Sequence, residues 1–515
     1  MIYPIGIQDF EKIRQQGCLY IDKTGLVYKL AKGIGYYFLS RPRRFGKSLL
    51  ISTMEAYFLG KKELFKGLAM EKLEHDWTVY PVLHLDLNTG EYKDKDGFHD
   101  ILYNKLSEWE RLYGSSPTET NPSLKFAGIV QRAYEKTGQK VVILIDEYDK
   151  PLLNSIGNPE LQDHYRSQMK AFYSVMKTQD KYIKLGFITG VTRFSKVSIF
   201  SDLNNFTDIS MDDDFVEICG ITEKEIHNNL DSEVEQMAKR NTLSKEECYD
   251  QLKNYYDGYH FCPNTIGIYN PFSLLSALRK ESFGEYWFET GTPTFLTELL
   301  QQSNFNLNDL VDEEITSNTI NSIDNMQENP VSVIYQSGYL TIKGYNKEFQ
   351  LYRLGFPNRE VENGFTRFLI PLYSNVSTVK SGSYISKLVT TIRRGEVEQF
   401  MALLEVFFAD SDYRIAGEAE LYFQNVIFVV FRLIGLYVEV ERPTSDGRMD
   451  LIVKTSDYIY IFEFKLDKSA DDALQQIEDK GYALPFATDP RPLFKIGVNF
   501  SSQHRRITEW KMTEK

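Results

Sequence analysis

The chain has 515 residues, more than the about 250–300 at which a single hydrophobic core stops growing, so we expect several domains. Its 42% hydrophobic, 25% charged and 14% aromatic residues indicate a globular protein and argue against a large disordered share. The net charge of −13 argues against a surface that coats nucleic acid indiscriminately, but it does not exclude a local basic groove. The four cysteines form no Cys-x-x-Cys pair, which fits a reducing compartment and gives no support to a zinc site.

The apolar stretches predict no membrane association. The N-terminus lacks a basic segment followed by an apolar one, so no secretory signal is visible. The longest apolar stretch, 426–440, is interrupted by Arg432 and is shorter than the about 20 residues that span a membrane. We therefore expect a cytoplasmic protein with no membrane partner.

The first part of the chain, to about residue 210, alternates apolar runs with amphipathic segments, a pattern typical of a parallel α/β sheet. We expect strands at 35–39, 81–87, 141–145 and 182–189. The runs at 141 and 182 are continuously apolar, as in strands that are covered on both faces.

Residues 41–48, RPRRFGKS, follow the first strand and precede a helical pattern that Gly60 can end. Strand, tight loop, Gly-Lys-Ser and helix are the context of a phosphate-binding loop. Lys47 would reach the β- and γ-phosphates of ATP, and the Ser48 hydroxyl would bind Mg²⁺. Arg41 replaces the first glycine of the general motif, and the alternative is a basic turn that caps an ordinary helix. The candidate nucleotide-binding residues of this loop are Arg44, Phe45, Gly46, Lys47, Ser48 and Leu49.

Two later strands end in polar residues that would complete such a site. Asp146 can hold the Mg²⁺ shell and Glu147 can act as general base, although an acidic pair at a strand end is common by itself. The strand at 182–189 is followed by Thr192 and Arg193 and itself ends in Thr189. Because parallel strands present their carboxyl ends along one crevice, we expect these residues beside the γ-phosphate.

The pattern changes after the sheet. It is helical and polar from 215 to 290, for instance at 221–230 and 245–256. The Asn-, Ser- and Asp-rich stretch 304–329 predicts a surface connection or loosely packed helices. Helical periodicity returns near 367, and a last α/β unit begins around 418.

A β-hairpin is predicted at 448–453 and 458–465. A four-residue turn at 454–457 would place Asp450 opposite Ile461, so that Asp450 and Glu463 become diagonal neighbours on one face. Two carboxylates can share a divalent ion, and Lys465 can orient water, which is the chemistry of phosphodiester hydrolysis. The alternative is a solvated hairpin face, but the apolar run around Glu463 requires a partner for a buried charge.

Weaker candidates lie on both sides of the hairpin. Glu420 opens a helical run and could supply a further metal-binding carboxylate, and Phe462 and Phe464 would face a helix. Ser469-x-x-Asp472 can cap a helix that carries Gln476 and Lys480. The basic tail 503–511 could touch phosphate, but we expect a solvated terminal helix there.

The chain also resembles a family. The N-terminal about 290 residues resemble the AAA-ATPase-like domain of uncharacterised bacterial and archaeal ATPases. The motifs that carry the resemblance are IDKT (21–24), RPRRFGKS (41–48), IDEYDKPL (145–152), ITGVTRFSK (188–196), FSDLNN (200–205), YDGY (256–259) and YNP (269–271). In that family the loop normally reads RPRRFGKS, so Arg41 is the family's own residue. The C-terminal about 110 residues resemble the PD-(D/E)xK nuclease superfamily, on GRMD up to Asp450 and on Glu463-Phe464-Lys465.

The resemblance implies an α/β protein with a P-loop NTPase parallel sheet and a restriction-endonuclease-like C-terminal domain. We expect an ATPase core at 1–215, a helical or winged-helix lid at 216–290, a helical connecting region at 291–385 and the nuclease-like domain at 386–515. The favoured function is an ATPase, with ATP and Mg²⁺ as cofactors, coupled to a metal-dependent nuclease that acts on DNA. The alternatives are a nucleotide-controlled switch whose nuclease fold only binds, and an ATPase that acts on protein complexes. A homo-oligomer is compatible with each.

Overall fold

The computed structural model divides the chain into two compact units. Unit 1 comprises Met1–Leu296 and Asp312–Val361, and unit 2 comprises Thr297–Val311 and Glu362–Lys515. The structure describes residues 2–193, 206–288, 296–297, 299–300, 305–310, 314–321, 323, 330–373, 378–409, 419–435, 438–441 and 450–514. The motif FSDLNN and the residues 194–196 lie outside these ranges. Among the described residues, no helix is long and apolar enough to cross a membrane.

The core of unit 1 is a parallel five-stranded sheet in the order β2-β3-β4-β1-β5. Its strands are β1 (Gly35–Ser40), β2 (Val82–Asp86), β3 (Val141–Asp146), β4 (Ile183–Gly190) and β5 (Phe206–Asp208). The four strands predicted from apolar runs are confirmed, and every residue of β3 is buried, as expected for a strand covered on both faces.

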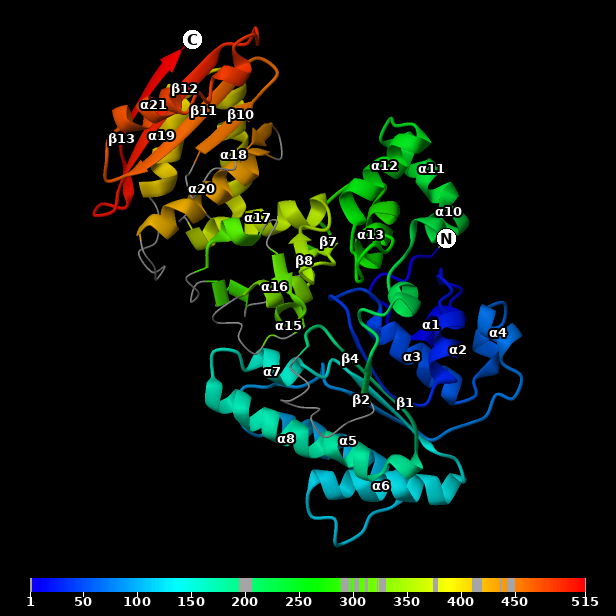
Figure 1. Cartoon of the computed structure of the whole chain (residues 1–515). Helices are drawn as coiled ribbons and strands as arrows, with labels where there is room; N and C mark the ends of the chain where they lie inside the picture. The colour runs from blue at the N-terminus through cyan, green and yellow to red at the C-terminus, as the bar shows by residue number, and fades with distance from the viewer. Residues whose placement is uncertain are drawn as a thin grey trace. The chain divides into compact units, whose positions relative to one another are not determined.

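Helices cover both faces of this sheet (Figure 1). On one side lie α1 (Phe10–Gln15), α2 (Thr24–Ala31) and α3 (Lys47–Phe58), and on the other α5 (Gly97–Tyr113), α6 (Pro122–Thr137) and α8 (Pro159–Thr178). The short helices α4 (Ala69–Leu73) and α7 (Lys150–Asn154) follow α3 and β3 in the chain. Helix α3 ends where Gly60 adopts a φ of 69°, so the predicted C-terminal glycine is confirmed.

A helical lid with its own core follows the sheet. It consists of α10 (Glu223–Asn229), α11 (Asp231–Arg240), α12 (Lys245–Tyr256) and α13 (Pro271–Lys280). Thr222 and Ser244 begin α10 and α12 with capping boxes, which satisfies N–H groups that a helix start otherwise leaves open. The helices predicted at 221–230 and 245–256 are therefore present.

A three-stranded antiparallel sheet lies in the stretch 291–385, which the sequence analysis expected to be helical. Its strands β6 (Glu314–Thr316), β7 (Thr341–Asn346) and β8 (Leu351–Gly355) are ordered β6-β8-β7, with α15 (Ser317–Ile320) and α16 (Val331–Gln336) between β6 and β7. This is the order of elements in a winged helix. The hairpin turns at Asn346, whose side chain accepts from the backbone N–H groups of Glu348 and Phe349.

Unit 2 is built on a mixed five-stranded sheet in the order β13-β12-β11-β10-β9. The strands are β9 (Glu439–Glu441), β10 (Asp450–Lys454), β11 (Ile459–Leu466), β12 (Leu493–Ser501) and β13 (Arg506–Glu514). The helices are α17 (Arg359–Tyr373), α18 (Thr378–Arg393), α19 (Val397–Ala409), α20 (Ala419–Gly435) and α21 (Ala470–Asp479). The boundary between the units falls within α17.

The two faces of this sheet are covered by different helices. Phe462 and Phe464 contact Phe431 of α20, so the expectation that they face a helix is confirmed. On the other face, Ile461 packs with Ile477 of α21. Alternation along β11 therefore puts Glu463 and Lys465 on the α21 side.

The C-terminal tail is a strand and not the expected solvated helix. Residues of β13 pair with β12 from Phe494↔Glu514 to Ser501↔Arg506. The segment is rich in Ile, Thr and Trp, which favour strands, and β12 would otherwise be left as an apolar edge.

Gly497 of β12 sets how closely α21 approaches the sheet. A Cβ at this position would lie 2.3 Å from the Ala470 carbonyl oxygen, whereas a Cβ at Gly382 of α18 would meet nothing within 4 Å. We expect Gly497→Ala to lower the free energy of unfolding of unit 2 by about 1–3 kcal/mol, because backbone must move. Gly382→Ala is the control and should raise it by up to about 1 kcal/mol, because alanine favours helix. Thermal unfolding of the two variants would contradict this if both changes had the same sign.

Candidate functional site

The phosphate-binding loop joins β1 to α3. Gly46 is the N-cap of α3, with a φ of 95°, and Lys47 is the first helical residue. The first turn of a helix leaves backbone N–H groups without helical partners, and the helix dipole adds positive potential. The loop therefore presents donors to an anion at the point where the sequence predicts phosphate binding.

Lys47 folds back over this loop. Its ammonium donates to the carbonyl oxygens of Arg41 (3.0 Å) and Pro42 (3.3 Å), and it lies 3.6 Å from a carboxylate oxygen of Glu147. The Lys47 side chain is buried, so each of these contacts offsets the cost of desolvating its charge. The structure thus brings together two residues that lie 100 positions apart in the sequence.

Arg41 points away from the loop into the protein. Its guanidinium lies 3.9 Å from the ring centroid of Phe261 and donates to the carbonyl oxygens of Ser40 (2.9 Å) and Ser210 (2.8 Å). Burial lowers the pKa of Arg41 to about 10. The large side chain at the usual glycine position therefore ties the loop to the lid and leaves the phosphate side open.

Asp146 is the last residue of β3, and Glu147, which follows it, lies next to the loop. Oδ1 of Asp146 accepts from the Thr189 hydroxyl (2.5 Å) and from the backbone N–H of Glu147 (3.0 Å). Glu147 has a φ of 53° and Arg44 a φ of 65°, and both side chains line one cavity. Such left-handed conformations of residues other than glycine are strained and cluster at functional sites.

Asp149 is a buried carboxylate that the sequence analysis did not single out. Its Oδ2 accepts from the backbone N–H groups of Val191 (3.0 Å) and Thr192 (2.6 Å) and from the Thr192 hydroxyl (2.6 Å). Burial raises the pKa of Asp149 to about 6, with a smaller contribution from Glu147. The Thr192 hydroxyl, expected at the γ-phosphate, is engaged by this carboxylate.

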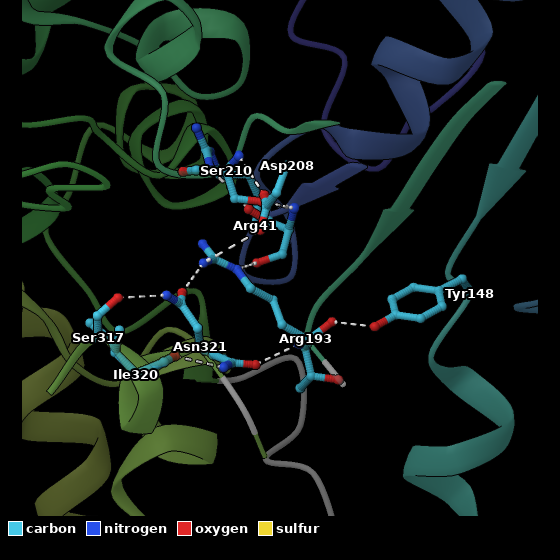
Figure 2. A network of polar contacts seen from close by, with 11 residues as sticks. Arg41, Tyr148, Arg193, Asp208, Ser210, Ser317, Ile320 and Asn321 are labelled. Carbon is cyan, nitrogen blue, oxygen red and sulfur yellow. Dashed lines mark hydrogen bonds and ion pairs between the residues drawn. The ribbon is translucent and has the colours of Figure 1, made fainter. Parts of the chain in front are cut away.

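Arg193 lies in a polar network beside the winged-helix part (Figure 2). Its backbone N–H donates to Gln336 (2.6 Å), and its guanidinium bonds Asn321 and lies 3.7 Å from Asp208. Gln336 in turn donates to the Ile320 carbonyl (2.8 Å). Arg193 therefore links the carboxyl end of the parallel sheet to α15 and α16, and it does not line the cavity at the phosphate-binding loop.

That cavity, in unit 1, measures about 550 Å³. Its polar lining residues include Arg43, Arg44, Gly46, Lys47, Ser48, Asn88, Glu147 and Lys150. Its apolar lining residues include Ile5, Ile7, Pro271, Phe272 and Leu275, and the Arg44 guanidinium lies 4.0 Å from the Phe272 ring centroid. Four cations against one carboxylate suit a polyphosphate, and the apolar side chains suit a planar base.

Aromatic residues after the lid also border this cavity. The Trp287 indole N–H donates to the Arg43 carbonyl (3.2 Å), and the Trp287 ring lies 5.0 Å from that of Tyr339. Gly338 has a φ of 93°, and a Cβ there would lie 2.5 Å from Pro42. The turn after α16 is therefore packed directly on the phosphate-binding loop.

The second candidate site lies on the sheet of unit 2. Asp450 is paired directly with Glu463, not diagonally as expected, because the turn begins one residue later. Thr455 closes that turn by accepting from the backbone N–H groups of Asp457 and Tyr458. Asp450 and Glu463 still lie on the same face of the sheet, because the pairing differs from the expected one by two residues, an even number. The structure describes the backbone of Asp450, and its side chain lies outside the described part.

Glu463 is fully buried and is held by Lys465. The Lys465 ammonium lies 2.5 Å from Oε1 of Glu463 and also bonds the side-chain oxygen of Gln476 on α21. The predicted capping box at Ser469 and Asp472 starts that helix. Glu420 is exposed in the first turn of α20 and has no contact with Glu463 or Lys465 among those the structure describes. Within the described ranges, no group of three or more His, Cys, Asp or Glu side chains could hold a metal ion.

Comparison with known proteins matches the two ends of the chain to two different family models. A family model described as a predicted AAA-ATPase matches residues 4–200, and one described as the PD-(D/E)XK nuclease superfamily matches residues 418–510. An Azotobacter chroococcum mcd 1 protein, described as an uncharacterized protein in the vnfD 5′ region, is 33% identical over 517 residues. That match covers 98% of this chain and 97% of the relative. The chain belongs to this family of AAA-ATPase-like proteins with a C-terminal PD-(D/E)XK domain.

The fold class expected from the sequence is confirmed for both ends of the chain. The solved Aeropyrum pernix ORC2 protein, in ADPNP and ADP complexes, is 10% identical over 67% of this chain and 88% of its own. The TM-score of this match is 0.24, which is too low to support a conclusion about fold or function.

The placement of Arg193 generates a test. We expect Arg193→Gln to lower the free energy of unfolding of unit 1 by about 1–3 kcal/mol, because buried partners lose a charged donor. ATP affinity should change by less than about threefold, since a site outside the contact range contributes independently. Thermal unfolding and equilibrium dialysis measure the two quantities. Lys239→Gln, at an exposed i,i+4 pair, is the control. Unchanged stability with a large loss of ATP affinity would instead put Arg193 at the nucleotide.

Proposed function

We propose that the chain binds and hydrolyses ATP in the cavity at the phosphate-binding loop. The lining fits a nucleotide, because it combines the start of helix α3 and Lys47, which suit phosphates, with apolar side chains, which suit a base. Lys47 would turn from the Arg41 and Pro42 carbonyls to phosphate oxygens. Bound Mg²⁺ would neutralise charge on the phosphates, and the residues that would hold it are Ser48 and Asp146.

In the proposed hydrolysis, Asp146 at the end of β3 and Glu147 after it are the residues that act on Mg²⁺ and on water. Glu147 would accept a proton from the attacking water, once its ion pair with Lys47 is released by the incoming phosphates. Thr189 and the backbone N–H of Glu147 fix the Asp146 carboxylate in one orientation. Asn88 and Lys150 also line the cavity, and we add them as nucleotide contacts.

We propose further that unit 2 is a metal-dependent nuclease that acts on DNA. The observation that carries this is the fully buried Glu463, held by Lys465 and paired in register with Asp450. A carboxylate in an apolar strand is costly unless a cation or metal compensates it, so its presence favours a function. Carboxylate oxygens suit Mg²⁺, and Asp450 and Glu463 would hold it, with Glu420 as a weaker candidate. The metal would supply a nucleophilic water and stabilise phosphate charge.

We propose that the nucleotide state gates this nuclease, in a cytoplasmic protein that can act as a homo-oligomer. The turn after α16 contacts the phosphate-binding loop, and the chain continues from this part through α17 into unit 2. The alternative function is a nucleotide-controlled switch in which the nuclease fold binds without cleaving.

Lys47→Ala tests the nucleotide site. We expect ATP affinity to fall about 100-fold, because a charge-assisted contact to phosphate is lost from a buried position. Isothermal titration calorimetry of the full chain measures this, with Lys29→Ala as a control, since Lys29 is half-exposed, pairs with Asp214 and does not line the cavity. Retained ATP affinity in Lys47→Ala would remove the phosphate-binding assignment.

Glu463→Gln tests the nuclease site. With linear and circular DNA, Mg²⁺ or Mn²⁺, and with or without ATP, we expect cleavage by the wild type and a loss of about 100-fold or more in the variant, because a metal-binding carboxylate is removed. ATP turnover should stay within about twofold. Glu439→Gln, on the edge strand of the same sheet and paired with Lys454, is the matched control. No cleavage by the wild type under any condition, with ATP still hydrolysed, would favour the switch.

A further inference from the structure

Four basic residues gather at one end of the unit 2 sheet. Lys468 follows β11, and His504, Arg505 and Arg506 lie in or beside the turn between β12 and β13. We name these four residues the basic rim. Two hydrogen bonds tie its two parts together: the Lys468 N–H donates to Asn499, and the Ser502 N–H donates to Asp467.

The strand register places the basic rim at the same end of the sheet as the candidate nuclease site. Glu463 pairs with Gly497 of the parallel strand β12, and four residues later Ser501 pairs with Arg506 of β13. Directly paired residues share a face, and so do residues two apart along a strand. Arg506 therefore lies on the face that carries Glu463 and Lys465. The separation along the sheet is roughly 13 Å, or about four base-pair steps of a duplex.

The charges at the two ends of the sheet differ in their pairing. At the far end, Lys454, Arg491 and Lys495 each form an ion pair with a carboxylate, those of Glu439, Asp489 and Glu478. In the described part of the chain, the side chains of the basic rim have no such partner.

The carboxylates near the basic rim are already engaged. Asp467 accepts from Ser502 and Asp472 from Ser469, Asp471 pairs with Lys511, and Glu509 accepts from the Ala470 N–H. In the described part of the chain, none of these carboxylates forms an ion pair with the basic rim. Cations without a carboxylate partner can contact a phosphate backbone.

We infer that the basic rim binds the phosphate backbone of the nucleic-acid strand that reaches Glu463 and Lys465. The inference rests on the proposed nuclease function and names the surface that holds its substrate. Arg506 contacts the phosphates nearest to the site, and Arg505, His504 and Lys468 extend the contact outward. Lys465 stays with Glu463 and takes no part in this anchoring.

The test compares two double substitutions that change the net charge equally. Arg505→Gln with Arg506→Gln, the rim variant, removes two cations of the basic rim. Lys454→Gln with Lys495→Gln, the far-end variant, removes two paired cations at the other end of the sheet. The full chain is titrated with a fluorescent 30-base-pair DNA duplex and with single-stranded RNA, in EDTA so that no cleavage occurs, over a series of NaCl concentrations.

We expect the rim variant to bind about 10-fold more weakly at 0.1 M NaCl, with a log–log salt slope lower in magnitude by about 1–2, because one or two phosphate contacts are lost. The far-end variant should match the wild type. Lys468→Gln, on a different segment, should weaken binding further when combined with the rim variant. Melting temperatures equal to that of the wild type would establish that these changes act on binding and not on folding.

The outcomes separate this inference from the nuclease function. A loss on DNA, on RNA or on both supports the basic rim and identifies which polymer it holds. Equal binding and equal salt slopes in the two double variants would overturn the rim, even where the wild type cleaves DNA. A wild type that binds through the rim but cleaves nothing would overturn the nuclease and leave the rim standing.

Discussion

A charge that leaves water must be compensated, and in this protein that requirement governs both candidate sites. Lys47 and Glu463 are each almost fully withdrawn from solvent, and transfer of an unpaired charge into the interior would cost more than folding can supply. The fold compensates Lys47 with two loop carbonyls and Glu147, and it compensates Glu463 with Lys465. In both places the buried charge has a polar or charged partner within ion-pair or hydrogen-bond distance.

Arg41 meets the same requirement without an ion pair to a carboxylate in the described part of the chain. Its guanidinium is buried against the Phe261 ring and donates to neutral carbonyls, including those of Ser40 and Ser210. A guanidinium is more weakly hydrated than an ammonium and can stack on an aromatic face, so this burial costs less for arginine than for lysine. Arg41 therefore connects the phosphate-binding loop to Phe261, which lies between α12 and α13 of the lid. Glycine at this position could not provide that connection.

The sequence predicted the elements well where one residue pattern determined them. Local periodicity together with one charged residue predicted three elements. These are the strand that ends in Asp146, the helix that begins at Lys47 and the strand around Glu463. The prediction failed where the outcome depended on a distant partner. Asp149 is defined by contacts with Val191 and Thr192, which follow another strand, and nothing in its local sequence marks it. The charges of the 503–511 tail suit a solvated helix, but the segment contains Ile507, Thr508 and Trp510, which favour strands, and it pairs with β12. The expected register of the 448–465 hairpin is wrong by two residues. Its turn begins one residue later than expected, and a one-residue change in the start of a turn shifts the pairing by two.

The winged-helix part packs on the phosphate-binding loop through the turn after α16. Every residue of α16 is buried. Gln336 at its end binds the backbone of Arg193, and the turn that follows packs on Pro42 of the phosphate-binding loop. Pro42 therefore contacts the Lys47 ammonium through its carbonyl and the turn after α16 through its ring. Helix α16 is therefore buried inside unit 1, and the turn that follows it contributes Ser337 and Tyr339 to the cavity at the phosphate-binding loop.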